Sequence, residues 1–165
     1  MMISRLDARF SRSLLPIVGG AIIIVMLSFC SSVKNDKVSI KQGVSGRVIW
    51  MEGNFMPSPD RAPDRVGKPA VRTVYIYKET KLAQTEGEAP LFSKIEGDLI
   101  AKVKTNKEGY FQCKLSPGKY SIFTLEEDRK FFANLFDGDG NIASFEVKTN
   151  EVTKYNISVN YKAAF

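Results

Sequence analysis

The chain has 165 residues, of which 44% are hydrophobic and 25% are charged, and its formal net charge is +6. This composition is typical of a globular protein with one ordinary domain. Because the chain has no histidine and only two cysteines, Cys30 and Cys113, Ser-His and Cys-His catalytic pairs and a four-cysteine metal site are excluded. The basic residues are spread along the domain, which predicts a solvated, mildly basic surface and no nucleic-acid partner.

Residues 1–29 have the form of a secretory signal peptide. Arg5, Arg9 and Arg12 precede an almost wholly apolar run, 14–29, and a basic segment followed by such a run is typical of export signals. The run is slightly shorter than the ~20 residues that a helix needs to span a bilayer. The sequence therefore predicts that the rest of the chain lies in the cell envelope, either periplasmic or surface-exposed.

The apolar run ends at Leu27-Ser28-Phe29-Cys30, which resembles a bacterial lipobox with Phe29 in place of the usual small residue. The resemblance implies cleavage before Cys30 and lipidation of Cys30, so that the protein is a lipoprotein anchored to the membrane. Two alternatives stay open: an uncleaved signal that anchors the chain, and ordinary secretion with Cys30 unmodified. Residues 30–42 are mostly polar and predict a flexible tether between the anchor and the domain.

Three alternating segments, 99–105, 110–115 and 120–125, organise the predicted domain. Period-two alternation of apolar and polar residues puts one face of each strand in the core. The first turn contains Gly109, which suits a left-handed conformation, and the second contains the Pro117-Gly118 pair of a type II turn. We expect a strand–turn–strand–turn–strand meander, with Cys113 as a buried, unreactive thiol on its inward face.

Further strands are predicted on both sides of this meander, with turn residues at intervals of roughly ten residues. Residues 52–69, rich in proline, and residues 79–90, mostly polar, predict two long loops. The sequence therefore predicts a single antiparallel β-sandwich of approximately seven strands, formed by residues 43–165, whose other strands lie at 43–51, 70–78, 130–136, 142–148 and 152–161.

Several motifs resemble the carboxypeptidase regulatory-like, or transthyretin-like, domain: Gly46-Arg47-Val48, Lys68-Pro69-Ala70-Val71, the segment 105–111 (TNKEGYF) and the segment 115–120 (LSPGKY). The match covers most of residues 43–125, and the remaining tail looks like small surface lipoproteins that carry this domain alone. The resemblance implies a transthyretin-like, carbohydrate-binding-like fold. It also implies an accessory module without catalytic residues of its own. The motifs say little more about function, because function does not follow from the fold alone.

Trp50, Tyr75 and Tyr77 are the candidate ligand-binding residues. Tyr75 and Tyr77 share a strand face opposite apolar residues of the same strand, so that face is the one expected to stay accessible. Core packing is the competing interpretation, since an alternating strand buries one aromatic face in any case. An exposed surface of this kind, together with the 52–69 loop, would bind a protein or glycan partner in the envelope.

The segment Asp137-Gly138-Asp139-Gly140-Asn141 carries oxygen ligands at alternate positions, as calcium loops do. Residues 142 and 148, isoleucine and lysine, occupy the positions where an EF-hand needs glycine and glutamate, so an EF-hand is excluded. A tight hairpin turn is favoured. Asp137, Asp139 and Asn141 remain weak metal candidates, and no cofactor is predicted.

The adjacent carboxylates Glu126, Glu127 and Asp128 are expected to be solvated, because an acid–base pair needs a cleft and opposed environments. The predicted function is a non-enzymatic, membrane-anchored, exported accessory or interaction module. One alternative is a carbohydrate- or peptide-binding surface protein that uses the exposed aromatic residues and the 52–69 loop. Another is a hydrolase that uses carboxylates alone.

Overall fold

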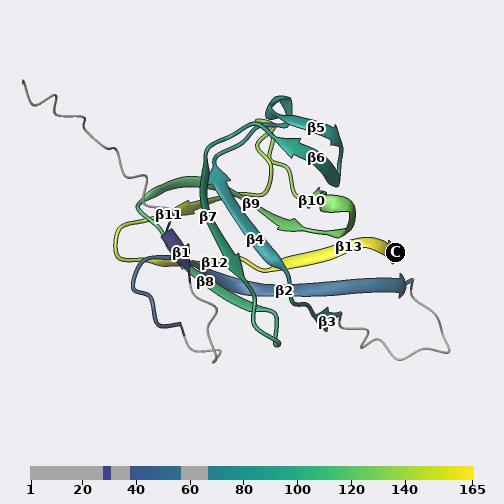
Figure 1. The fold of residues 1–165 in the computed structure, drawn as a ribbon, viewed down its shortest axis with the longest axis horizontal. Helices are drawn as coiled ribbons and strands as arrows, with labels where there is room; N and C mark the ends of the chain where they lie inside the picture. Colours follow the sequence, from purple (N-terminus) through teal and green to yellow (C-terminus); the bar gives the residue numbers. More distant parts are fainter. Residues whose placement is uncertain (1–27, 31–37, 57–66) are drawn as a thin grey trace, which may run out of the picture.

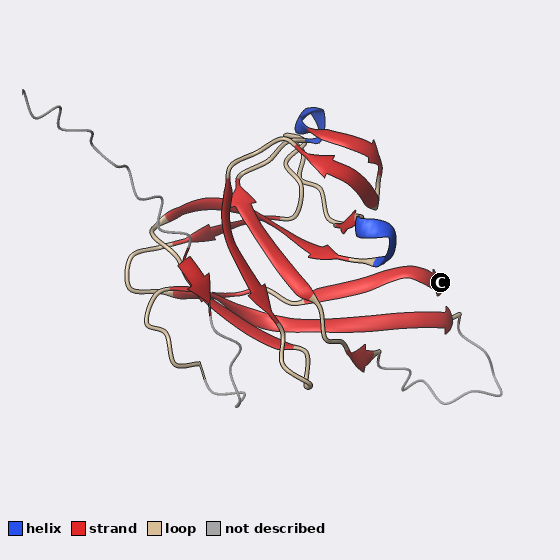
Figure 2. Ribbon diagram, viewed as in Figure 1, coloured by secondary structure: helices blue, strands red, loops and turns tan. Residues whose placement is uncertain are grey.

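The protein folds into two β-sheets that pack face to face, as a computed structural model shows (Figures 1 and 2). The structure describes residues 28–30, by their backbone alone, together with 38–56 and 67–165. In this part of the chain there is no α-helix, only two short 3-10 turns at Leu82–Gln84 and Glu127–Arg129. The strands are β1 (Ser28–Cys30), β2 (Gly43–Asn54), β3 (Lys68–Pro69), β4 (Thr73–Lys78), β5 (Thr85–Glu88), β6 (Leu91–Ile95), β7 (Leu99–Lys104), β8 (Tyr110–Lys114), β9 (Gly118–Leu125), β10 (Phe131–Phe132), β11 (Ser144–Val147), β12 (Val152–Lys154) and β13 (Ile157–Ala164).

The eight-stranded sheet has the order β1-β7-β4-β9-β10-β6-β5, with β11 also paired to β9. In the five-stranded sheet the long strand β2 pairs with all four remaining strands, β3, β8, β12 and β13. The expected all-β, sandwich-like architecture is therefore confirmed. The pairing is mostly antiparallel, as expected, but β12 and β13 run parallel to β2 and β1 runs parallel to β7. The strands also outnumber the approximately seven that were expected.

The predicted meander over 99–125 is also wrong in its pairing, although its three strands exist. Strand β8 pairs with β2 in the five-stranded sheet, whereas β7 and β9 flank β4 in the eight-stranded sheet. The chain thus crosses between the layers at both turns. Gly109 has φ +73, and a Cβ there would overlap the Val48 carbonyl. The N–H of Val48 donates a hydrogen bond to the Gly109 carbonyl at 2.8 Å. A residue without a side chain is needed where the crossing chain passes this close to β2.

The main core lies between the sheets and contains fully buried side chains such as Val44, Val74, Ile76 and Phe111. Part of the opposite face of the eight-stranded sheet is buried as well. Hairpin β5–β6 folds back so that Phe92, at 0% exposure, packs against Phe123 with ring centroids 6.4 Å apart. The second half of the expected loop at 79–90 therefore belongs to a hairpin, because β5 (Thr85–Glu88) pairs with β6 and places polar side chains on an exposed edge strand.

The other predicted loop, 52–69, is shorter than expected, since β2 continues to Asn54 and β3 pairs with Ile49 and Trp50. Pro69 fits in β3 because it lies on a two-residue edge strand, where a missing N–H is tolerated. The middle of the loop, 57–66, lies outside the described residues.

Most of the predicted signal and tether also lies outside the described residues. Strand β1 pairs with β7, with Ser28 opposite Ala101 and Cys30 opposite Val103. Cys113 is fully buried, as expected, but it is disulfide-bonded and is not a thiol; Cys30 is the only other cysteine of the sequence. Among the described residues, no helix is both long and apolar enough to cross a membrane.

Candidate binding groove

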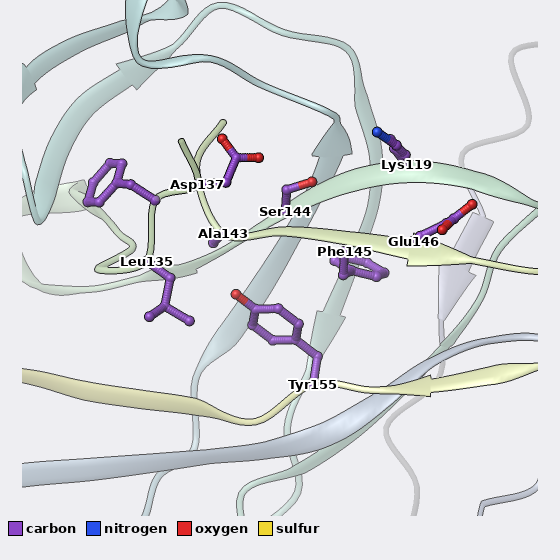
Figure 3. Close-up of a pocket in the computed structure, with 9 residues that line it drawn as sticks. Lys119, Leu135, Asp137, Ala143, Ser144, Phe145, Glu146 and Tyr155 are labelled. Atoms are coloured by element: carbon purple, nitrogen blue, oxygen red, sulfur yellow. The ribbon is translucent and has the colours of Figure 1, made fainter. Parts of the chain in front are cut away.

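A groove opens where the two sheets separate along one side of the sandwich, between β11 and the connection from β12 to β13 (Figure 3). Its cavity has a volume of about 360 Å³, which is within the range of about 300–1,000 Å³ typical of ligand sites. We call this cavity the edge groove. Its lining residues are Lys119, Leu135, Phe136, Asp137, Ala143, Ser144, Phe145, Glu146 and Tyr155.

Two large apolar side chains at the edge groove are exposed to solvent, Leu135 at 55% and Phe136 at 45%. Their backbone is held against the adjoining segment by a hydrogen bond from the Ala143 N–H to the Leu135 carbonyl at 2.8 Å and by a bridge between Phe136 and Ile142. The sequence predicted a strand here. The structure ends β10 at Phe132, so the two side chains face solvent and not a partner strand.

The turn after Phe136 is held by the carboxylate of Asp137. Its Oδ1 accepts hydrogen bonds from the N–H groups of Asp139 at 2.9 Å and Asn141 at 2.8 Å, and its Oδ2 accepts one from Asn141 Nδ2 at 2.7 Å. The hydrogen bonds from Asn141 lower the pKa of Asp137 below its ordinary value. Asp137, Asp139 and Asn141 thus share one turn, and both Asp137 oxygens accept hydrogen bonds within it. In the described ranges, no group of three or more acidic or cysteine side chains is arranged to hold a metal.

Tyr155 forms the floor of the edge groove, and Figure 3 shows its ring lying between Leu135 and Phe145. Its ring centroid is 5.5 Å from that of Phe145, and its N–H bonds to the Ser45 carbonyl at 2.9 Å. The neighbouring Gly46 has no room for a Cβ, because the Tyr155 carbonyl lies against it. Burial raises the pKa of Tyr155 to about 12. Its hydroxyl, protonated at neutral pH in any case, therefore stays protonated well into the alkaline range and can donate a hydrogen bond.

A smaller cavity of about 130 Å³ shares Leu135, Ala143 and Tyr155 with the edge groove. In its wall Asn134 joins the two sheets, since its Nδ2 donates to Asn160 Oδ1 at 3.0 Å and to the Ser158 carbonyl at 3.4 Å. The opening between the layers is therefore bounded on this side by a polar contact.

The rim of the edge groove carries both signs of charge. Glu146 on β11 lies directly opposite Lys119 on β9. Glu79 Oε1 accepts a hydrogen bond from Ser144 Oγ at 2.8 Å and lies 4.0 Å from Lys119 Nζ. Together with Asp137, three carboxylates and one ammonium group lie at or beside the rim, so the groove combines an apolar floor with a predominantly acidic rim.

The aromatic residues singled out in the sequence lie elsewhere. Tyr77 belongs to the core: it is 7% exposed and its ring meets Phe123 edge-on at 5.7 Å. Tyr75 is half-buried, with its ring 5.2 Å from Phe131 and Lys102 Nζ 4.8 Å from its centroid. Both lie on β4, whereas Trp50 lies on β2 in the other sheet, so the structure does not combine the three into one surface.

Trp50 is part of a polar cluster that joins the two sheets. Its ring meets Tyr161 edge-on at 5.2 Å, with Arg72 Cζ 5.3 Å and Lys162 Nζ 5.6 Å from its centroid. Glu126 completes the cluster. We call Trp50, Arg72, Glu126 and Tyr161 the clasp.

The carboxylate of Glu126 contradicts the expectation that this acidic turn is solvated. Its side chain is 1% exposed. Arg72 Nε donates to both of its oxygens, at 3.1 and 2.9 Å, and the Tyr161 hydroxyl lies 3.4 Å from Oε2. A buried carboxylate needs such partners to offset the loss of hydration. Glu127 remains exposed and pairs with Lys162 at 2.9 Å.

Sequence reasoning singled out Asp137 as a metal candidate but did not combine the residues of the edge groove into one site. Tyr155 was placed in an alternating core strand, but the ladder with β2 is interrupted between Lys154 and Ile157, which leaves its ring at the opening. Because 155–161 alternate without a break, the sequence offers no signal that separates Tyr155 from the residues that follow it.

Comparison with known protein families, with characterised proteins and with solved structures finds no match for this chain. What the fold and the groove define is a class: an all-β protein of two packed sheets with an open, apolar-floored groove at one edge. Its function is therefore argued from the fold and this groove.

Proposed function

We propose that this protein is a non-enzymatic, exported and membrane-anchored interaction module that binds its partner in the edge groove. The observation that carries the proposal is the groove itself, where Leu135 and Phe136 are more than 40% exposed beside a cavity of about 360 Å³. Exposed apolar side chains beside a cavity are a common mark of binding sites. The two-sheet architecture also supports the proposed relation to transthyretin-like accessory domains.

The alternative function is binding of carbohydrate or peptide, and the edge groove suits it better than the aromatic residues of β4 do. The burial of Tyr77 and the contacts of Tyr75 with Phe131 and Lys102 leave little of either ring for a ligand. The edge groove offers an aromatic floor at Tyr155 and polar groups at its rim.

Export is supported by the disulfide at Cys113, because disulfides persist mainly in oxidising compartments. The anchor is either a lipid on Cys30 or the uncleaved N-terminal signal. A lipid on Cys30 would occupy the sulfur that a disulfide between the two cysteines of the chain would need. Cleavage before Cys30 would also remove two of the three residues of β1. These observations favour the uncleaved anchor over the lipid, and both versions keep the domain at the membrane.

The proposal is tested with the full chain in native membranes. A photoreactive phenylalanine analogue at position 136 is expected to crosslink a discrete partner, whereas the same analogue at position 165, also an exposed phenylalanine, does not. The intact mass of the extracted protein then identifies the anchor as a lipidated Cys30 or a retained Met1. A chain recovered in the soluble fraction, or equal crosslinking from both positions, would overturn the proposal.

A further inference from the structure

Strand β11 has one paired edge and one open edge, and the open edge borders the edge groove. It pairs with β9 in the register Ser144 opposite Ser121 through Val147 opposite Gly118. On the other side, Thr153 Oγ1 donates to the Glu146 carbonyl at 2.6 Å. The backbone of Glu146 therefore points away from β9, and alternation puts the backbone of Ser144 on the same open edge.

The open edge is available for a further strand over a short distance. Thr153 caps its far end, at Glu146. Within the described residues, nothing caps the backbone of Ser144, which lines the cavity. An unpaired edge presents the N–H and C=O groups that an extended peptide can pair with.

The two faces of β11 specify what such a peptide would carry. Phe145 is buried on the groove side, so side chains of an added strand on that face would enter a cavity floored by Tyr155 and Leu135. Glu146 is exposed on the opposite face. Because side chains alternate along a strand, apolar residues for the cavity would alternate with residues that face Glu146.

Charge favours basic residues at those alternate positions. The rim carries the carboxylates of Asp137 and Glu146, with Glu79 beside them, against one ammonium among the lining residues, Lys119. The whole chain, by contrast, carries a net charge of +6. A locally acidic rim on a basic protein attracts a cationic partner and repels an acidic one.

We propose that the edge groove binds an extended peptide in which bulky apolar and basic residues alternate, added as a strand to the open edge of β11. This inference rests on the proposed function and names its class of partner. Main-chain hydrogen bonds to Ser144 supply affinity, the cavity selects the apolar side chain, and the acidic rim selects the basic one.

The test measures binding of labelled pentapeptides to the detergent-solubilised full chain. Lys-Leu-Lys-Leu-Lys is expected to bind at least about tenfold more tightly than Glu-Leu-Glu-Leu-Glu or Lys-Ser-Lys-Ser-Lys, a difference of about 1.4 kcal/mol. Backbone N-methylation of the first peptide is expected to abolish binding, since it removes the strand hydrogen bonds. Phe136→Ser weakens binding and the matched control Phe165→Ser leaves it unchanged.

Each other outcome overturns the inference. Equal binding of the acidic peptide removes the charge argument, and binding of the N-methylated peptide removes strand addition. If position 136 still crosslinks a partner in membranes while a neutral oligosaccharide and not the peptide binds the groove, the proposed function stands and the peptide is wrong. If position 136 crosslinks nothing and the peptide also fails to bind, both fail.

Discussion

The clasp and the edge groove are built from similar residues and lead to opposite results. Each combines aromatic rings, carboxylates and a cation where the two sheets meet. At the clasp, the buried carboxylate of Glu126 is bonded to Arg72, and Tyr161 packs against Trp50, so the layers are closed. At the groove, Leu135 and Phe136 remain exposed. Composition alone therefore does not separate a structural contact from a binding surface. The deciding fact is whether each group already has its partner within the fold.

The largest effect is expected from breaking the clasp. Glu126→Ala leaves the partly buried guanidinium of Arg72 without its counter-ion and the Tyr161 hydroxyl without an acceptor, and should reduce the free energy of unfolding by about 3 kcal/mol. Urea denaturation measures the loss. The matched control is Glu127→Ala, whose side chain is 72% exposed and whose removal should cost less than about 1 kcal/mol. Equal losses would mean that burial of Glu126 does not close this end of the sandwich.

A smaller, pH-dependent effect is expected at the turn that borders the groove. Hydrogen bonds from Asn141 lower the pKa of Asp137 in the folded state, so its carboxylate stabilises the fold above the unfolded-state pKa of about 3.9. This contribution is lost as the pH falls through the lower folded pKa. Unfolding midpoints of the wild type and Asp137→Asn should therefore differ at pH 7 and converge once the pH falls below the lowered folded pKa of Asp137. A constant difference across this range would show that the charge of Asp137 does not hold the turn.

The smallest effect on stability is expected within the groove itself. Phe136→Ser removes a side chain that is 45% exposed, and should change the free energy of unfolding by no more than about 0.5 kcal/mol. Thermal or urea unfolding of the full chain checks this value, with Phe165→Ser as the matched exposed phenylalanine. A loss of stability comparable to that of Glu126→Ala would place Phe136 in the structural core. The clasp and the edge groove would then not differ in the way proposed.

Several features followed from the sequence alone, because they depend on local chemistry. Alternation of apolar and polar residues identified the strands around Val74, Phe111 and Ile122, and the need for a left-handed residue identified Gly109. The lack of histidine excluded Ser-His and Cys-His catalytic pairs. The N-terminal run predicted export, which stays a prediction because residues 1–27 lie outside the described structure.

Pairing and burial were decided by contacts between residues far apart in the chain. A period-two pattern states that one face of a strand is apolar, but the same pattern fits a strand in either layer. The sequence therefore could not place β8 in the opposite sheet from β7 and β9, or β13 parallel to β2. Glu126 is buried because Arg72, distant in sequence, meets it, and Tyr155 floors a groove because the ladder beside it is interrupted. These are properties of long-range geometry that local propensity does not encode.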